Sequence, residues 1–195
     1  MLCTWQVLYQ AQNARELSVD FVSAIPSRQL EDDAMVNIRM DGGVTVRLWT
    51  SSVAVGSFHG FNVRVFGEKG RLRWAQQCPD QLNWTPLNGR SEIIERGSAY
   101  LSPEAERATR IATGHSEGML VAFANIYADL AEAIAARRSA TPINPHAAHF
   151  PTAIDGLRSI AAVKASVESA KANGAWMDAR PRVCATRYSA MCRAR

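Results

Sequence analysis

Short stretches of alternating polar and apolar residues dominate the first half of the chain, a pattern that predicts half-buried β-strands. The clearest of them are residues 17–25, 36–40, 44–50, 63–66 and 71–74, and two shorter strands are expected at 81–84 and 92–95. The turn Asp41-Gly42-Gly43 joins two of these strands into a hairpin. Because the connections are too short for crossovers, we expect the strands to be antiparallel and to form one meander.

Residues 64–74, RVFGEKGRLRW, contain two glycines around a lysine, which can belong either to a phosphate-binding loop or to a turn. A phosphate loop of the Walker type needs a helix after the glycines. Here Arg71 to Trp74 alternate as a second strand, so the pattern favours a β-hairpin in which the glycines supply positive φ angles.

The second half of the chain changes to a helical period. Ser102-Pro103 is a typical helix start, and Thr152 is a typical cap. Two longer helices are predicted, at 117–138 and from 152 to about 173, and the apolar stripe of each is expected to cover the sheet. The stripe of the first helix is Leu120, Phe123, Ile126, Tyr127, Leu130 and Ile134. The stripe of the second helix is Ile154, Leu157, Ile160, Val163 and Val167. Strands followed by helices predict an α+β fold, with an open, mainly antiparallel sheet and helices packed on one face.

Composition and charge indicate one soluble domain. The chain has 195 residues and 47% hydrophobic residues, and we find no run of about twenty apolar residues and no signal peptide, so we expect a cytoplasmic protein. The net charge of +4 arises in the segment 179–195, which holds five arginines and no acid. We therefore expect a domain at 17–178, an irregular segment at 1–16 and a basic, disordered tail at 179–195, without nucleic-acid binding. The four cysteines show no metal-ligand spacing.

Alternation also places arginines and aromatic residues on the sheet face opposite the predicted core. Arg47, Trp49, Arg64 and Phe66 belong to this set. A solvated face is the simpler interpretation, but aromatics mixed with arginines are typical of protein interfaces. We expect a homo-oligomer, most simply a dimer, joined through these four residues, and Trp49 can alternatively line a sugar-facing surface.

His115 and Glu117, at the start of the first long helix, are the candidate substrate-binding residues. A histidine with a near-neutral pKa can hydrogen-bond a hydroxyl group, while the structural alternative is that both belong to a helix-capping segment. His59, His146 and His149 lie in predicted loops, where we expect them to be solvated. None of the histidines has the spacing of a metal site.

Five segments in this order resemble the C-terminal domain of the glucose–fructose oxidoreductase/inositol dehydrogenase/rhizopine-catabolism (Gfo/Idh/MocA) family. They are DDAMV (32–36), LWTSSVAVG (48–56), VRVFGEKGRLRW (63–74), GHSEGMLVAFANIY (114–127) and FPTAIDGLR (150–158). The resemblance implies an open sheet backed by helices, a domain that lines part of a substrate pocket, and oligomer contacts through the sheet. It also implies NAD(P)-dependent oxidation or reduction of a sugar, inositol or related polyol.

The sequence departs from that family in its cofactor-binding part. No G-x-G-x-x-G fingerprint is present, so we expect no cofactor to bind to this chain alone, and a separate Rossmann domain is the expected partner. The family's Glu-Lys-Pro lysine has no counterpart, since Glu68-Lys69 is followed by Gly70, and its catalytic histidine motif would lie upstream. The catalytic residues are thus unknown. Two functions stay open: the substrate-binding and oligomerisation half of an oxidoreductase, or a non-catalytic interaction module.

Overall fold

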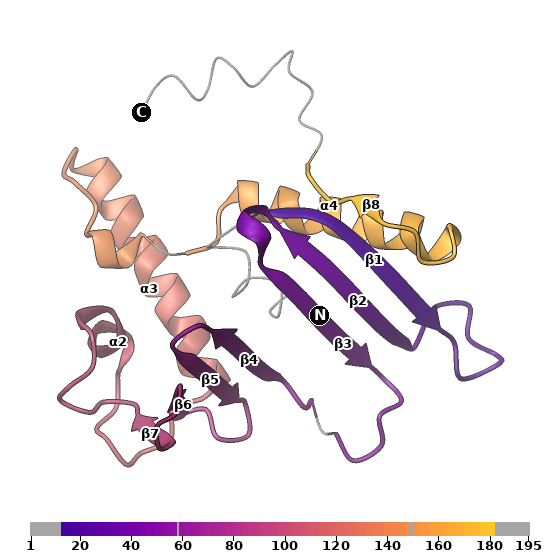
Figure 1. Ribbon diagram of the computed structural model, residues 1–195. Helices are drawn as coiled ribbons and strands as arrows, with labels where there is room; N and C mark the ends of the chain where they lie inside the picture. The colour runs from indigo at the N-terminus through magenta and orange to yellow at the C-terminus, as the bar shows by residue number, and fades with distance from the viewer. Residues whose placement is uncertain (1–12, 58, 149, 182–195) are drawn as a thin grey trace. The chain divides into compact units, whose positions relative to one another are not determined.

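The computed structural model describes residues 13–57, 59–148 and 150–181, and the chain divides into two compact units. Unit 1 combines Met1–Gly56 with Pro151–Arg195, and unit 2 is Ser57–Phe150. In Figure 1, unit 1 takes the indigo and yellow ends of the colour range, and unit 2 takes the colours between them. Each unit has its own four-stranded antiparallel sheet among the described residues.

Unit 1 is built on a sheet with the strand order β3-β2-β1-β8. Its elements are β1 (Ala14–Val22), β2 (Asp33–Met40), the 3-10 turn η1 (Asp41–Gly43), β3 (Thr45–Ser51), α4 (Ala153–Lys171) and β8 (Met177–Asp178). Strands β2 and β3 form the predicted hairpin, with Val36 opposite Leu48. Gly42 and Gly43 adopt φ angles of 82° and 85° in the turn, which glycine tolerates because it has no Cβ atom.

The core of unit 1 lies between one face of this sheet and α4 (Figure 1). The buried apolar residues of both layers are Ala14, Leu17, Val19, Val36, Ile38, Met40, Ala162, Ala165 and Ala179. The alternate residues of the strands point to the other face, and among them Asn37, Arg39 and Arg47 are polar, as expected for an antiparallel sheet with one open side. The predicted α+β class, with an open antiparallel sheet and a helix on one face, is confirmed.

Small side chains of α4 make its contact with β1. Ala162 and Ser169 are fully buried, and Ala165 is nearly so. The Ser169 hydroxyl accepts a hydrogen bond from the Val19 N–H at 3.0 Å and donates one to the Ala175 carbonyl at 2.7 Å. Small residues at these positions allow the helix to approach the strand closely enough for a serine to reach its backbone.

The larger aliphatic side chains of α4 point away from the sheet. These are the residues predicted to form the core stripe, Ile154, Leu157, Ile160, Val163 and Val167, and each exposes between 40% and 53% of its surface. The prediction that this stripe covers the sheet is therefore wrong. Because α4 is apolar on two faces, close packing selected the face with the smaller residues.

Strand β1 begins and ends three residues earlier than the alternation predicts. Its end has a specific cause, the fully buried side chain of Asp32. The Asp32 carboxylate accepts hydrogen bonds from the N–H groups of Ala24 at 2.8 Å and Ile25 at 3.2 Å. These bonds turn the chain away from the sheet after Val22.

Unit 1 also extends beyond the predicted boundaries of 17 and 178. Ala14 is buried in the core, and Ala179 is buried and donates its N–H to the carbonyl of Arg15 at 3.0 Å. Residues 14–16 are thus part of a strand, and the predicted disordered tail does not begin at 179. The remaining parts of the two predicted flanking segments, 1–12 and 182–195, lie outside the described residues.

Unit 2 contains a second sheet, with the strand order β4-β5-β6-β7. Its strands are β4 (Asn62–Gly67), β5 (Gly70–Ala75), β6 (Gln81–Pro86) and β7 (Glu92–Glu95). The predicted hairpin is confirmed, since Gly67 pairs with Gly70 across the turn and Val65 pairs with Leu72. The expectation of a single meander is wrong: the predicted strands divide between two sheets, and no ladder joins β3 to β4 in the described part of the chain.

Two helices and a short turn follow this sheet: α2 (Pro103–Ala108), α3 (Met119–Arg138) and η2 (Pro145–Ala147). The predicted cap of α2 is confirmed, because the Ser102 hydroxyl accepts from the Ala105 N–H. Arg107 links α2 to α3 through two ion pairs of 2.7 Å, to Asp129 and to Glu132.

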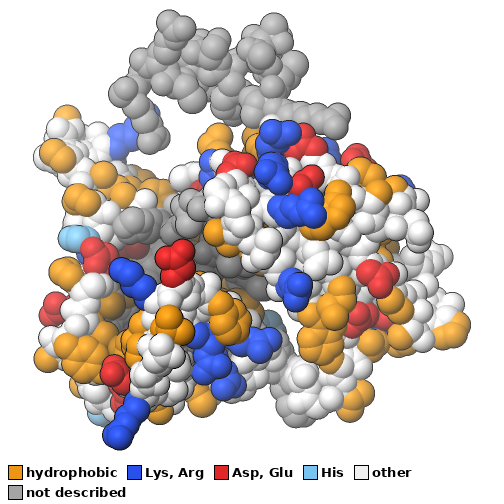
Figure 2. Space-filling view, in the orientation of Figure 1, with side chains coloured by type: hydrophobic (Ala, Val, Ile, Leu, Met, Phe, Trp, Pro, Cys, Tyr) orange, Lys and Arg blue, Asp and Glu red, His pale blue; other side chains and the backbone are white. Residues whose placement is uncertain are grey.

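Helix α3 has no buried residue, although its apolar stripe was predicted to cover the sheet. Hydrophobic side chains are visible over much of the surface in Figure 2. By length and composition, α3 is also long and apolar enough to span a membrane, contrary to the sequence-based expectation. However, Asp129 and Glu132 lie in the second half of the helix and bind Arg107, which favours a helix of a folded unit.

Candidate functional site

The segment between α2 and α3, residues 109–118, carries the two candidate substrate-binding residues of unit 2. Glu117 is buried and exposes 6% of its surface, whereas His115 is exposed. Gly114 takes a φ angle of 89° immediately before the histidine, and Gly118 is the residue that precedes α3. The sequence therefore places a buried acid and an exposed imidazole two residues apart.

Arg96, which follows β7, is the centre of the contacts that hold this segment. Its Nε donates to Asp80 Oδ1 at 2.8 Å, and its Nη1 donates to Glu117 Oε1 at 2.9 Å. The same Glu117 oxygen accepts hydrogen bonds from the backbone N–H groups of Arg110, at 2.6 Å, and Ile111. One oxygen of the carboxylate thus accepts from one cation and two amides, a structural arrangement typical of a buried charge.

Arg96 also fixes the backbone beside the histidine. One of its terminal nitrogens donates to the carbonyl of His115, and the other donates to the carbonyl of Ile111 at 2.8 Å. We call Arg96, Asp80 and Glu117 the Arg96 cluster. Within the described residues the His115 imidazole has no hydrogen-bond partner, so the cluster holds its backbone while its ring nitrogens stay available to a ligand.

Asp80, in the turn before β6, completes the cluster. Besides the Arg96 guanidinium, its Oδ1 accepts the N–H of Glu117 at 3.1 Å. The hydrogen bond from Arg96, and after it the backbone bond from Glu117, hold the pKa of Asp80 below its ordinary value. Asp80 is therefore ionised near neutral pH and matches the charge of the guanidinium.

These contacts separate the roles of the two predicted residues. For Glu117 they favour the structural alternative, since Arg96, Arg110 and Ile111 occupy the carboxylate. His115 remains a candidate for binding a hydroxyl group. The sequence analysis did not identify Arg96 and Asp80. An arginine after a strand and an aspartate in a turn are common, and neither residue belongs to a recognisable sequence motif.

Trp49, the third predicted binding residue, lies in unit 1 on β3. Its indole N–H donates to Asp33 at 2.9 Å, and 56% of its surface is exposed. Met35 lies directly opposite it on β2 and is 52% exposed. Trp49 and His115 belong to different units, so they do not form a single site within either one.

The predicted oligomer face is likewise divided. Arg47 and Trp49 belong to β3 of unit 1, whereas Arg64 and Phe66 belong to β4 of unit 2. The four side chains therefore do not share the single sheet face on which the alternation placed them. Any interface must be considered separately for each sheet.

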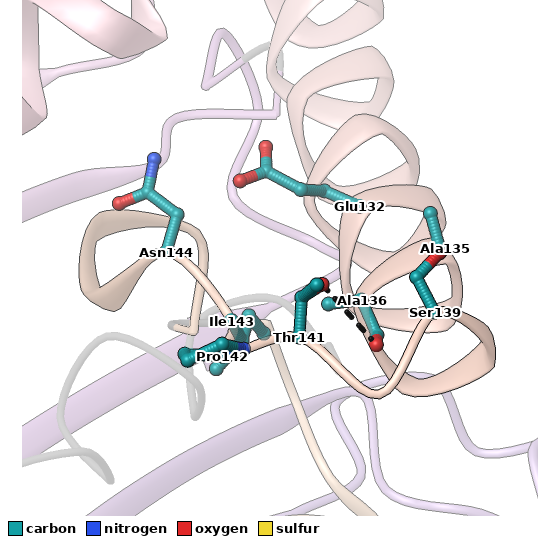
Figure 3. Close-up of a pocket in the computed structure, with 8 residues that line it drawn as sticks. All are labelled: Glu132, Ala135, Ala136, Ser139, Thr141, Pro142, Ile143 and Asn144. Carbon is teal, nitrogen blue, oxygen red and sulfur yellow. Dashed lines mark hydrogen bonds between the residues drawn. The ribbon is translucent and has the colours of Figure 1, made fainter.

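A cavity of about 400 Å³ lies beside the C-terminal half of α3 (Figure 3). Its lining consists of Glu132, Ala135, Ala136, Ser139, Thr141, Pro142, Ile143 and Asn144. Glu132 is the ionisable group of this lining and is already paired with Arg107. The Thr141 hydroxyl is also engaged, by the Ala136 carbonyl. Because Glu132 and Thr141 already have partners, we assign no ligand to this cavity.

The remaining histidines do not form a metal centre. His146 is not simply solvated as predicted, because its Nδ1 lies 2.8 Å from a carboxylate oxygen of Glu104. His59 is exposed in a loop, and His149 lies outside the described residues. In the described parts of both units, no three histidine, cysteine or acidic side chains converge as metal ligands.

A nicotinamide cofactor does not fit the described residues. Dinucleotide sites hold the pyrophosphate at a glycine-rich turn between a strand and a helix. The glycine turn here, Gly67 to Gly70, joins two antiparallel strands and offers no helix N-terminus. Among the described residues, no other glycine-rich turn leads from a strand into a helix.

Comparison with known proteins identifies the class. A family model described as the oxidoreductase family, C-terminal alpha/beta domain, matches residues 4–178. The uncharacterized oxidoreductase YfiI of Bacillus subtilis (strain 168) is 29% identical over 174 residues, which are 89% of this chain and 44% of that protein. The chain therefore belongs to the Gfo/Idh/MocA oxidoreductase family, as its C-terminal domain.

Solved structures have the same fold as this chain and match it over most of its length. An oxidoreductase from Sinorhizobium meliloti is 41% identical with a TM-score of 0.79, and the match covers 86% of this chain and 47% of that one. An inositol dehydrogenase homolog from Azotobacter vinelandii, complexed with NADH and myo-inositol, is 31% identical with a TM-score of 0.80, over 91% of this chain and 47% of that one. The chain spans about half the length of these relatives.

Proposed function

We propose that this chain is the substrate-binding half of an NAD(P)-dependent oxidoreductase that acts on an inositol, a sugar or a related polyol. The observation that carries the proposal is the similarity, at 31% identity, to a protein complexed with NADH and myo-inositol. The described residues contain no dinucleotide site, so the nicotinamide would be held by another domain. The contribution of this chain is then to bind and orient the polyol.

His115 is the residue of this chain that best suits a polyol hydroxyl. A neutral imidazole presents one donor and one acceptor, which match a hydroxyl group in either direction. Its backbone is held by Arg96, and its side chain is exposed. A fixed backbone reduces the conformational entropy lost when the ring is ordered against a ligand.

A chimera tests this function. The half of the Azotobacter vinelandii protein that this chain does not match is fused in front of it, and NADH formation is followed at 340 nm with a panel of polyols. We expect oxidation of myo-inositol or a close relative. A chimera that folds and binds NADH, yet oxidises no polyol of the panel, would contradict the proposal.

Within that chimera, His115→Ala is expected to raise the KM for the polyol about fivefold, with a smaller change in kcat. The reason is the loss of one hydrogen bond, worth about 1 kcal/mol. His59→Ala is the matched control, because His59 is an exposed loop histidine of the same unit. Equal effects of the two substitutions would remove His115 from the polyol site.

A second candidate function is a non-catalytic oligomerisation module, and the open face of the unit 1 sheet favours it. Met35 and Trp49 lie opposite each other there, and each exposes more than half of its surface. Arg47, on the same face, is exposed as well. Arginine, methionine and tryptophan are enriched in protein interfaces.

We expect the 195-residue chain to be a dimer in light scattering, and Trp49→Asp to convert it to a monomer with unchanged circular dichroism. The charge would face the partner's apolar surface without a counterion. Val55→Asp is the control, because Val55 is fully exposed in a loop. A monomeric wild-type chain at tens of micromolar would contradict a self-interface on this face.

A further inference from the structure

The structural role of Glu117 uses only one of the two oxygens of its carboxylate. Oε1 accepts from Arg96 and from the N–H groups of Arg110 and Ile111. Among the described residues the other oxygen, Oε2, has no hydrogen-bond partner. It is nevertheless not enclosed, because Arg107 Nε is the one buried side-chain atom without a partner in that part of the chain. Glu117 is thus a buried acid with one open acceptor atom.

The other acids that hold backbone in this protein use both of their oxygens. In Asp32, Oδ1 accepts from the Ala24 N–H and Oδ2 accepts from the Ile25 N–H. In Asp155, Oδ2 accepts from the Thr152 N–H and Oδ1 accepts from Arg158. An acid with a purely structural role is therefore satisfied at both oxygens here, and Glu117 departs from that pattern.

The open oxygen is held in place before any ligand arrives. The three hydrogen bonds to Oε1 fix the end of the side chain, and the N–H of Glu117 donates to Asp80 at 3.1 Å. A glutamate on the open surface loses side-chain entropy when it binds a ligand, whereas Glu117 is already ordered. Oε2 is therefore a preorganised acceptor.

His115 provides a second group beside this oxygen. It precedes Glu117 by two residues, so the two Cα atoms are at most about 7 Å apart, and Arg96 contacts both residues. A carboxylate can only accept hydrogen bonds, whereas a neutral imidazole has one donor and one acceptor. The pair therefore suits a ligand with two hydroxyl groups close together.

The guanidinium groups of this segment are engaged elsewhere. Arg96 donates to Asp80 and to Oε1 of Glu117, and the Nε of Arg110 donates to the side-chain oxygen of Asn125 at 2.6 Å. A ligand with a negative charge would meet the carboxylate of Glu117, and like charges brought together disfavour binding. The open oxygen thus favours a neutral hydroxyl over an acidic group.

We propose that Oε2 of Glu117 accepts a hydrogen bond from one hydroxyl of the polyol while His115 binds a neighbouring hydroxyl. The site then selects neutral polyols with two adjacent free hydroxyl groups and rejects sugar acids. This inference rests on the proposed function and extends it to substrate specificity. Glu117 is the specificity-determining residue, and Arg96 is a positioning residue that orients it.

Glu117→Gln in the chimera tests this role directly. The glutamine keeps one oxygen for Arg96 and the two N–H groups, but it replaces Oε2 with a nitrogen that donates. We expect the KM for myo-inositol to rise about tenfold with a smaller change in kcat, because a hydrogen bond to a charged acceptor is lost.

Asp80→Asn is the matched control, since it removes one negative charge from the same Arg96 cluster. It should change the KM by less than about twofold. Equal effects of the two substitutions would overturn the inference, because the KM would then follow loosening of the segment. An active chimera whose KM is unchanged by Glu117→Gln would overturn it as well, and would leave the proposed function intact.

A second measurement uses the 195-residue chain alone, labelled with ¹³C at the glutamate carboxyl carbons. The resonance of Glu117 is assigned by its loss in Glu117→Gln. We expect it to shift on addition of myo-inositol and to stay in place on addition of sodium glucuronate. No shift with myo-inositol, or an equal shift with glucuronate, would overturn the inference. A chimera that oxidises no polyol, together with the expected shift, would contradict the proposed function and support this binding site.

Discussion

Replacing Arg96 with methionine is expected to lower the free energy of unfolding by about 3 kcal/mol, because it leaves the buried carboxylate of Glu117 without its cation. Two further hydrogen bonds, to the carbonyls of Ile111 and His115, are lost at the same time. Chemical denaturation measures the change. Amide hydrogen exchange locates it, since the N–H groups of Arg110 and Ile111 should lose protection.

Arg180→Met is the control for this substitution. Arg180 also pairs with a carboxylate at 2.8 Å, but both side chains are substantially exposed, so its removal should lower the free energy of unfolding much less than Arg96→Met does. If Arg96→Met costs no more than the control, the cluster does not hold the segment before α3.

Acid stability gives a second readout of the same cluster. Since the folded-state pKa of Asp80 is lowered from 3.8, its contribution is present above that value and is lost as the pH falls through the lowered pKa. The Arg96→Met variant has lost the group that lowers the pKa. It should therefore lose less of its remaining stability than the wild type between about pH 5 and pH 2.

Ala162→Asp is expected to abolish folding of unit 1, with a cost above about 4 kcal/mol. The side chain of Ala162 is fully buried between α4 and the sheet, where an aspartate would be too large and its charge unpaired. Loss of the circular dichroism signal, or a urea midpoint too low to measure, is the expected observation.

Ile160→Asp is the matched control, because it introduces the same charge two residues away on the outward stripe. Ile160 exposes 53% of its surface, so the cost should stay below about 1 kcal/mol. The opposite order of the two effects would mean that the stripe predicted from the sequence does face the core.

Local features of the fold could be predicted because they depend on neighbouring residues. The β2–β3 and β4–β5 hairpins follow from alternation around glycine turns, and the cap at Thr152 follows from its hydrogen bonds with Asp155. The orientation of α4 could not be predicted in the same way. Its apolar periodicity identifies a stripe of large residues, but whether that stripe or the alanine and serine face meets the sheet depends on close packing across 150 residues.

The candidate site was predictable only in part. The segment 114–118 attracted attention through its histidine and glutamate, yet the residue that organises it, Arg96, lies 21 residues before Glu117 and in no motif. Three acids of the family-like segments, Asp32, Glu117 and Asp155, bind backbone N–H groups. Because these acids stabilise turns and helix ends, the segments that resemble the family identify its fold more directly than its catalytic residues.

The hydrogen bond between Val19 and Ser169 has a consequence for the order of folding. It closes a loop of 150 residues, and all of unit 2 lies inside that loop. During synthesis the packing of β1 against α4 must therefore wait until α4 has left the ribosome, while the β1–β2 pairing and the hairpins of unit 2 can form from contacts close in sequence. Until then the apolar face of the first three strands is without its helix, which makes this stage the one at which a nascent chain is most dependent on chaperones.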